Sequence, residues 1–129
     1  MQIIRSRNEN PSNNPTETFT GEVWMDQVLT DDNITVLDVF FTPNARTYWH
    51  THEIGQLLTV MHGSGYIAKE NNEIYAIESG DKVYIPAGEV HWHGAGPDSY
   101  LLHTAVSLGK TKWLDEVSEK DYNLINDID

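Results

Sequence analysis

The chain has 129 residues, enough for one domain, and its 20 acidic against 8 basic residues give a formal net charge of −12 at pH 7. A surface this negative repels nucleic-acid phosphates and anionic lipid headgroups, so we expect neither nucleic acid nor a membrane as a partner. The absence of cysteine excludes disulfides, thiolate nucleophiles and Cys-ligated zinc.

Residues 1–18 are rich in Asn, Ser, Pro and charge, which indicates an irregular N-terminal lead-in. This segment has no apolar stretch of the kind found in secretory leaders. No run in the chain approaches the roughly 18 apolar residues of a membrane-spanning helix. We therefore expect a cytoplasmic protein.

Residues 19–110 consist of short segments that alternate apolar and polar residues and are separated by turn residues such as TDDN, SGD and GPD. The candidate strands are 19–25, 34–41, 46–52, 56–63, 65–70, 73–78, 81–87, 89–95 and 100–107, with GSG read as a turn between the fourth and fifth. Closely spaced strands with no helical period between them predict an all-β antiparallel sandwich or barrel.

Residues 111–129 are the one segment with a helical pattern. Trp113, Val117 and Leu124 form a loose apolar stripe. Ser118, followed three residues later by Asp121, resembles a capping box. We expect a short helical tail that packs on the outside of the sheet.

All six histidines lie between positions 50 and 103. Side chains alternate between the faces of a strand, so His50 and His52 share one face and His91 and His93 share another. A single His-x-His pair is usually a feature of a strand surface. Two pairs on separate strands can converge if both strands line one barrel, and this favours a metal site. His62 precedes the GSG turn and is explained by a solvated strand end.

The polarity of the flanking strands indicates which side chains point inward. Asp38 should face water, which directs its neighbours Leu37, Val39 and Phe41 into the interior. By the same alternation, Gln56 shares a face with Leu58, and His103 shares a face with Leu101. Buried imidazoles are costly unless their nitrogens find partners. A divalent cation satisfies several at once, and imidazole suits Mn, Fe, Ni, Cu or Zn.

The chain resembles the cupin family in two motifs. The stretch NARTYWHTHEIGQLLTVMHG supplies His50, His52, Gln56 and Gly63, and GDKVYIPAGEVHWHGA supplies Gly80, Pro86, Gly88 and His91. Three positions depart from the family pattern. Asn44 stands where the family has Gly, Gln56 where it has Glu, and Ala95 where it has Asn. Asn also tolerates positive φ, so the turn at Asn44 should survive.

This resemblance implies a jelly-roll β-barrel that binds one metal ion through His50, His52, Gln56 and His91. A neutral amide at Gln56 leaves one more unit of positive charge on the site than a carboxylate would. The ion should therefore be a stronger Lewis acid and a better trap for an anion or alkoxide.

The Gln variant, WHTH and HWHGA together resemble a narrower group, the manganese-dependent cupin hydroxynitrile lyases. That resemblance implies cleavage of a cyanohydrin to an aldehyde and HCN, or the reverse. Manganese is the first candidate ion, with Fe, Ni or Zn as the others. His93 or His103 would act as general base. The alternatives are that His93 supports a ligand or is a strand-face residue hydrogen-bonded to a neighbour, and that His103 is a core histidine. Leu37, Val39, Phe41, Leu58 and Leu101 would line the substrate pocket.

Two other functions remain open from the sequence. Three histidines and one oxygen ligand also suit an Fe(II) dioxygenase, and a small cupin can bind a small molecule without turnover. The family analogy favours a homodimer or homotetramer. Trp49 and Trp92 should point away from the metal, where they either form an interface or pack under the helical tail.

Overall fold

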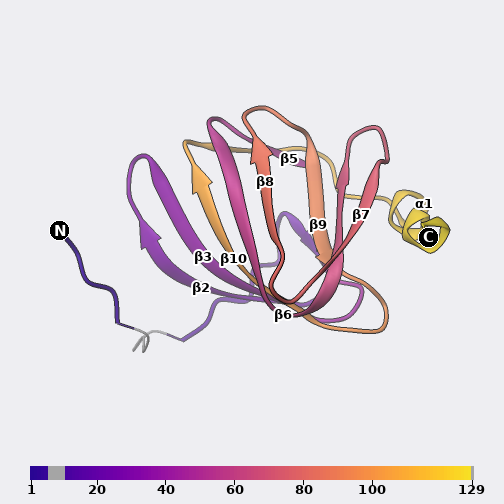
Figure 1. Ribbon diagram of the computed structural model, residues 1–129, viewed down its shortest axis with the longest axis horizontal. Helices are drawn as coiled ribbons and strands as arrows, with labels where there is room; N and C mark the ends of the chain where they lie inside the picture. Colours follow the sequence, from indigo (N-terminus) through magenta and orange to yellow (C-terminus); the bar gives the residue numbers. More distant parts are fainter. Residues whose placement is uncertain (6–10, 129) are drawn as a thin grey trace.

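The computed structural model describes residues 1–5 and 11–128, and the chain forms a nearly closed β-barrel (Figure 1). One half consists of β2 (Val23–Thr30), β3 (Ile34–Phe41), β10 (Leu101–Leu108), β8 (Lys82–Pro86) and the first part of β6 (Gly55–Lys69). The other half consists of β1 (Phe19–Thr20), β4 (Arg46–Thr47), β9 (His91–Ala95), β7 (Ile74–Glu78) and the second part of β6. β5 (His50–His52) joins β9, and β11 (Thr111–Trp113) joins β5. The expected all-β barrel is confirmed.

Strand alternation positions the core as the sequence predicted. Along β10, buried and half-buried residues alternate without interruption. Phe41, Leu58 and Leu101 are fully buried, and Val39 is nearly so. These inward side chains belong to one apolar cluster that fills the barrel, so burial of one face of each strand accounts for the closed shape.

The GSG segment is not a turn, and the prediction of two strands there was wrong. β6 runs unbroken through it, pairing with β10 and β8 before Ser64 and with β9 and β7 from there on. The register between β6 and β10 shifts between Leu102 and His103, which marks a β-bulge. Gly63, at φ +81°, lies two residues along β6 from the bulged Met61, and a Cβ there would clash with the carbonyl oxygen of Tyr100. Gly63 is therefore required for close backbone approach where β6 changes partners.

The expected strand 19–25 is also divided. Gly21 has φ +84°, and a Cβ there would lie 2.9 Å from the Cα of Ala45. The chain therefore leaves β1, which pairs with β4, and enters β2, which pairs with β3 and continues to Thr30. One short segment thus crosses from one half of the barrel to the other.

The helical tail is shorter than we expected. Residues 111–113 form β11, and helix is confined to α1 (Glu119–Tyr122) and the 3₁₀-helix η1 (Asn123–Asp127). β-branched and aromatic residues favour strands, and the edge of β5 offers them backbone partners. The expected cap is confirmed, because the Asp121 N–H donates to Ser118 Oγ at 3.1 Å.

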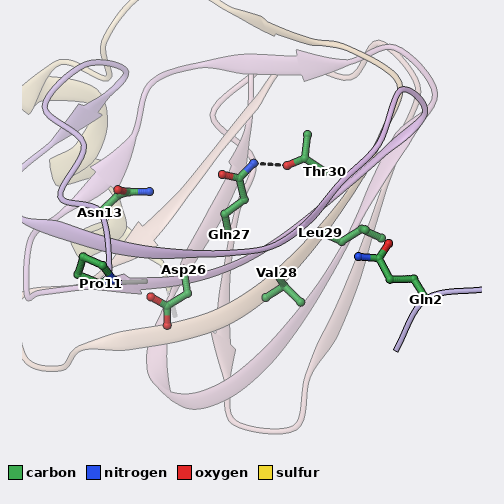
Figure 2. A pocket seen from close by; sticks show the side chains of 8 residues that line it. All are labelled: Gln2, Pro11, Asn13, Asp26, Gln27, Val28, Leu29 and Thr30. Atoms are coloured by element: carbon green, nitrogen blue, oxygen red, sulfur yellow. Dashed lines mark hydrogen bonds between the residues drawn. The ribbon is translucent and has the colours of Figure 1, made fainter. Parts of the chain in front are cut away.

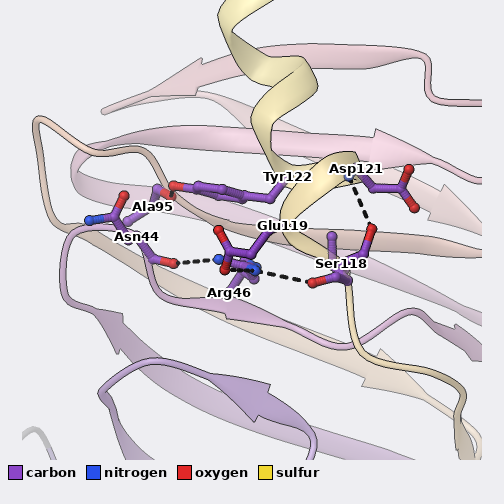
Figure 3. Close-up of polar contacts among 8 residues, drawn as sticks. Asn44, Arg46, Ala95, Ser118, Glu119, Asp121 and Tyr122 are labelled. Carbon is purple, nitrogen blue, oxygen red and sulfur yellow. Dashed lines mark hydrogen bonds and ion pairs between the residues drawn. The ribbon is translucent and has the colours of Figure 1, made fainter.

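The tail is fastened to the barrel through Arg46 of β4 (Figure 3). Its guanidinium donates to the Val117 carbonyl at 3.1 Å, pairs with Glu119 at 3.0 Å and lies 4.2 Å from the centre of the Tyr122 ring. The Tyr122 hydroxyl donates to the Ala95 carbonyl of β9 at 2.8 Å. These contacts tie the helix to β4 and to β9, the strand that carries His91 and His93.

Trp92 and Trp49 pack under this tail. Trp92 is 1% exposed and lies 5.7 Å from the Tyr122 ring, and half-buried Trp49 packs against the same small cluster. Of the two alternatives left open by the sequence, the structure has the one in which both rings pack under the tail.

The described part of the lead-in contacts β2. Asn13 forms a β-bridge with Met25, and Figure 2 shows Pro11, Asn13 and Gln2 around a hollow of about 400 Å³ beside β2. Residues 6–10 of the expected lead-in lie outside the described residues. None of the helices in the described ranges has the length and apolarity needed to cross a bilayer.

Two glycines with similar backbone angles offer a matched test of the bulge. Gly63→Ala adds a clash with Tyr100, whereas a Cβ on Gly80, at φ +94°, meets nothing within 4 Å. We expect Gly80→Ala to lower the free energy of unfolding by about 1–2 kcal/mol from backbone strain alone. Gly63→Ala should cost more than about 3 kcal/mol, since backbone must also move. Urea unfolding of both variants measures the difference, and equal losses would contradict this role for Gly63.

Candidate metal centre

Five of the six histidines lie inside the barrel. They are His50 at 1% exposure, His52 at 2%, His91 at 1%, His93 at 3% and His103 at 0%. The two His-x-His pairs meet because β5 and β9 are neighbours with His50 opposite His91, and these two rings lie 4.2 Å apart. His62 is exposed, in line with its exclusion from the site.

Three of these rings converge closely enough to hold one metal ion. One nitrogen from each of His50, His91 and His93 lies within 4.8 Å of the other two. His52 lies beside this group, with its ring 5.0 Å from that of His50 and 5.4 Å from that of His91. Two of the three predicted ligand histidines, His50 and His91, therefore lie in this group together with His93, and the third, His52, lies beside it.

Three imidazoles share one anchoring pattern, in which Nδ1 is hydrogen-bonded to an oxygen behind the ring. The bonds run from His50 to the Tyr48 carbonyl at 2.8 Å, from His91 to the Glu89 carbonyl at 2.9 Å, and from His52 to Thr111 Oγ1 at 3.1 Å. A neutral imidazole has one N–H, so a ring that donates from Nδ1 presents an Nε2 lone pair to the cavity. Outer hydrogen bonds of this kind orient histidines that bind metals.

Burial keeps these three rings neutral. It lowers the pKa of His50 well below its usual value of 6.5, with the nearby His91 ring adding to the effect. Burial lowers the pKa of His52 to about 4 and also lowers that of His91. Near pH 7 all three therefore hold a lone pair that a cation can accept.

The contact between Gln56 and His91 fits a bound cation. Gln56 Oε1 lies 3.1 Å from His91 Nε2, and the Gln56 amide nitrogen donates to Ser107 Oγ at 3.0 Å. With the His91 proton on Nδ1, both facing atoms are acceptors. Neighbouring ligands of an octahedral ion with bonds of about 2.1 Å lie about 3 Å apart. His52 Nε2 is also buried without a hydrogen-bond partner among the described residues. The donors therefore fit one divalent transition-metal ion.

His93 and His103 form a second unit beside this group. His103 Nε2 lies 2.9 Å from His93 Nδ1, so one proton bridges the two rings. The centre of the Phe41 ring lies 6.1 Å from that of His93 and 5.1 Å from that of His103. Burial lowers the pKa of His93 well below 6.5, with His103 next in effect, and lowers that of His103 to about 4. The pair is therefore uncharged near pH 7, and either ring can donate in this hydrogen bond, according to the tautomers of the two rings.

A cavity of about 100 Å³ opens between the histidines and one apolar wall. Leu37, Val39 and Phe41, three of the five residues expected at a substrate pocket, line it. Leu58 and Leu101 are fully buried in the core but are not among the residues that line this cavity.

The chain matches a family described as "Cupin domain" over residues 37–101, half of its length. It is 35% identical to (R)-mandelonitrile lyase of Granulicella tundricola, with 95% of this chain and 98% of that protein aligned. This chain belongs to the cupin family. The resemblance in its two histidine motifs is thereby confirmed.

Two further proteins are similar to this cupin. A cupin-like protein from Thermotoga maritima has a crystal structure that superposes with a TM-score of 0.84 at 38% identity, over 92% of this chain and 96% of that one. An acireductone dioxygenase of Gluconobacter oxydans is 28% identical over 56% of this chain and 40% of its own length.

Three aromatic or flexible residues at the cavity were missed from the sequence: Phe19, Met25 and Trp113. Trp113 lies 4.6 Å from the His50 ring and 5.9 Å from Phe19, and it is 40% exposed. We had placed Trp113 on a helix. The period-two spacing of Thr111 and Trp113, which both line the cavity, was the available signal.

The lowered pKa of His103 predicts how the stability of this cupin depends on pH. Between pH 6.5 and 4 the unfolded chain binds a proton at His103 that the folded chain does not, so stability falls as the pH falls. The shift is worth roughly 3 kcal/mol. Urea unfolding of metal-free protein at pH 7 and pH 4 should show this loss, and His103→Gln should reduce it. His62→Gln is the exposed control, and the same pH dependence in both variants would refute the prediction.

Proposed function

We propose that this cupin is a metal-dependent hydroxynitrile lyase that cleaves a cyanohydrin into an aldehyde and HCN, or joins them. The proposal rests on one observation. The candidate metal ligands, which are histidines and the Gln56 amide, are all uncharged, and they lie beside the uncharged His93–His103 pair. The 35% identity to a protein named (R)-mandelonitrile lyase supports it.

His50, His52, Gln56 and His91 would hold the ion, with His93 free to act on the substrate. The three histidines are the ones with Nδ1 anchored to an oxygen, whereas His93 bonds through Nδ1 to another imidazole. We propose manganese, with Fe, Ni or Zn as the other candidates. When bound, the ion supplies Lewis acidity that lowers the pKa of a substrate hydroxyl, and a neutral Gln56 leaves it more of its charge than Glu would.

His93 Nε2 is the proposed base. It is buried, has no hydrogen-bond partner among the described residues and lies at the ion-binding group. When its Nδ1 donates to His103, Nε2 carries the lone pair that takes the hydroxyl proton. The C–C bond electrons leave with cyanide as the carbonyl forms, and the imidazolium returns the proton to cyanide. Burial favours this return because it destabilises the charged ring.

Leu37, Val39 and Phe41 would contact the organic group of the cyanohydrin. Their wall lies opposite the histidines in a cavity of about 100 Å³, well below the roughly 300 Å³ at which drug-sized ligand pockets begin. Small cyanohydrins should therefore be accepted more readily than large ones, and both sizes belong in the assay.

The decisive experiment measures cyanide released by manganese-loaded protein from racemic mandelonitrile and from a small aliphatic cyanohydrin. We expect release above the buffer rate, and a loss of at least about a hundredfold in His91→Ala. His62→Ala is the matched control, since His62 is exposed and outside the site. It should keep the parent rate.

The lyase proposal would be overturned if the parent protein, with metal shown to be bound, released no more cyanide than the His91→Ala variant. Ligand-dependent stabilisation without turnover would instead favour a small-molecule-binding cupin. His93→Gln should lower kcat and leave metal content unchanged, because His93 is proposed as base and not as ligand. Loss of metal in that variant would refute this assignment.

A dioxygenase is the second candidate. It is favoured by the three-histidine group, which also suits Fe(II), and by the acireductone dioxygenase relative. Gln56 weighs against it, since loss of the carboxylate disfavours Fe(III). We expect Gln56→Glu to lower cyanide release about tenfold or more and to increase O₂ uptake by iron-loaded protein. Strong O₂ uptake by the parent chain, unchanged in Gln56→Glu, would reverse this order of candidates.

A further inference from the structure

The barrel wall is incomplete between β7 and β8. These strands follow each other in the chain and both pair with β6, but within the described residues they do not pair with each other. Tyr75 shows the consequence. Its partner on β6 is Ile67, a core residue, so Tyr75 lies on the inner face of β7, yet it is 48% exposed. Inner-face side chains are therefore accessible from solvent at this place, which we call the β7–β8 seam.

A pocket of about 320 Å³ opens at the β7–β8 seam, and we call it the seam pocket. Its apolar lining includes Ile67, Ile77, Val83 and Ile85, all of which belong to the core or pack against it. The cavity proposed for the substrate has only about 100 Å³. Sites for small organic molecules begin at roughly 300 Å³ and are mostly apolar with a few polar groups, so the seam pocket has the size and lining of such a site.

The seam pocket lies next to the candidate metal ligands. His91 lines it and does not line the cavity proposed for the substrate, whereas Gln56 lines only that cavity. The 3.1 Å contact between Gln56 Oε1 and His91 Nε2 therefore lies between the two. Glu89, whose carbonyl is bonded to His91 Nδ1, also lines the seam pocket. A molecule bound there would contact a metal ligand without occupying the cavity proposed for the substrate.

The charges around the seam pocket favour a neutral ligand. Lys69, which lines the pocket, pairs with Glu73 at 3.4 Å and with Glu89 at 3.6 Å. Two carboxylates and one ammonium disfavour an anion, and the ammonium already occupies the place of a bound cation. Burying either kind of ion against the isoleucines would also be costly. Tyr75 and Tyr84 add aromatic rings to the lining, and aromatic rings pack well against another ring.

We propose that the seam pocket is a second small-molecule site, which binds a neutral organic molecule of about one ring with one hydrogen-bonding group. The ring packs on the isoleucines and the two tyrosines, and the polar group reaches Lys69 or Glu89 at the edge of the pocket. Binding there requires no cyanohydrin and no turnover. The proposal therefore does not rest on the proposed lyase activity.

Benzyl alcohol is the probe, and NMR titration of the methyl signals of the zinc-loaded full chain measures its binding. We expect a Kd of about 1 mM, in keeping with the size of the probe. Benzoate and benzylammonium have the same ring with a negative or a positive charge, and each should bind at least about fivefold more weakly. Equal or tighter binding of either ion would overturn the neutral ligand class. No saturable binding of any of the three up to about 20 mM would overturn the site.

Two matched substitutions locate the bound probe. Val83 is half-buried, and its β6 partner Leu58 is fully buried, so Val83→Phe fills the seam pocket from the inner face. Leu37→Phe adds a similar ring at a half-buried position in the cavity proposed for the substrate. We expect Val83→Phe to weaken benzyl alcohol binding at least about tenfold and Leu37→Phe to leave it unchanged. The reverse result, or equal effects, would overturn the assignment to the seam pocket.

A surface substitution keeps the test valid if Val83→Phe does not fold. Tyr75→Ala removes one aromatic ring of the seam pocket at a position that is 48% exposed. We expect about threefold weaker binding of benzyl alcohol. Tyr100→Ala is the control, because Tyr100 is 43% exposed and does not line the seam pocket. Equal binding by these two variants would contradict the proposal.

Discussion

The pairing of β5 with β9 is the interaction on which the rest of the site depends. It sets His50 opposite His91, so two His-x-His pairs from distant parts of the sequence meet inside an apolar barrel. Burial then removes charge from each ring, and outward Nδ1 bonds direct the free lone pairs to one point. A metal site follows from these three effects together, because an apolar interior without an ion would leave several ring nitrogens unpaired.

The C-terminal tail contributes to this site from outside the barrel. β11 pairs with β5 along its whole length, and Thr111 anchors His52. Arg46 and Tyr122 hold the following helix against β4 and against β9, the strand that carries His91 and His93. The tail thus couples the stability of the fold to the geometry of the histidines, and it also places Trp113 at the cavity.

The half-barrel that carries Gln56, His103 and the apolar wall presents different side chains on its two faces. Inward residues of β3, β6 and β10 line the cavity, and their immediate neighbours along each strand lie on the outer face. Alternation with period two makes this possible, because each strand presents an independent set of side chains to each side.

The sequence by itself determined the all-β fold, the inward faces of β3 and β10 and the two histidine pairs, since these follow from local alternation. It did not predict that β6 passes through Gly63, that Thr111 and Trp113 form a strand, or that His93 and His103 share a proton. Each depends on contacts between different strands or segments, which local pattern does not specify: Gly63 with Tyr100, β11 with β5, β9 with β10. Local pattern specifies which face a side chain takes, and only tertiary packing decides which other strand that face meets.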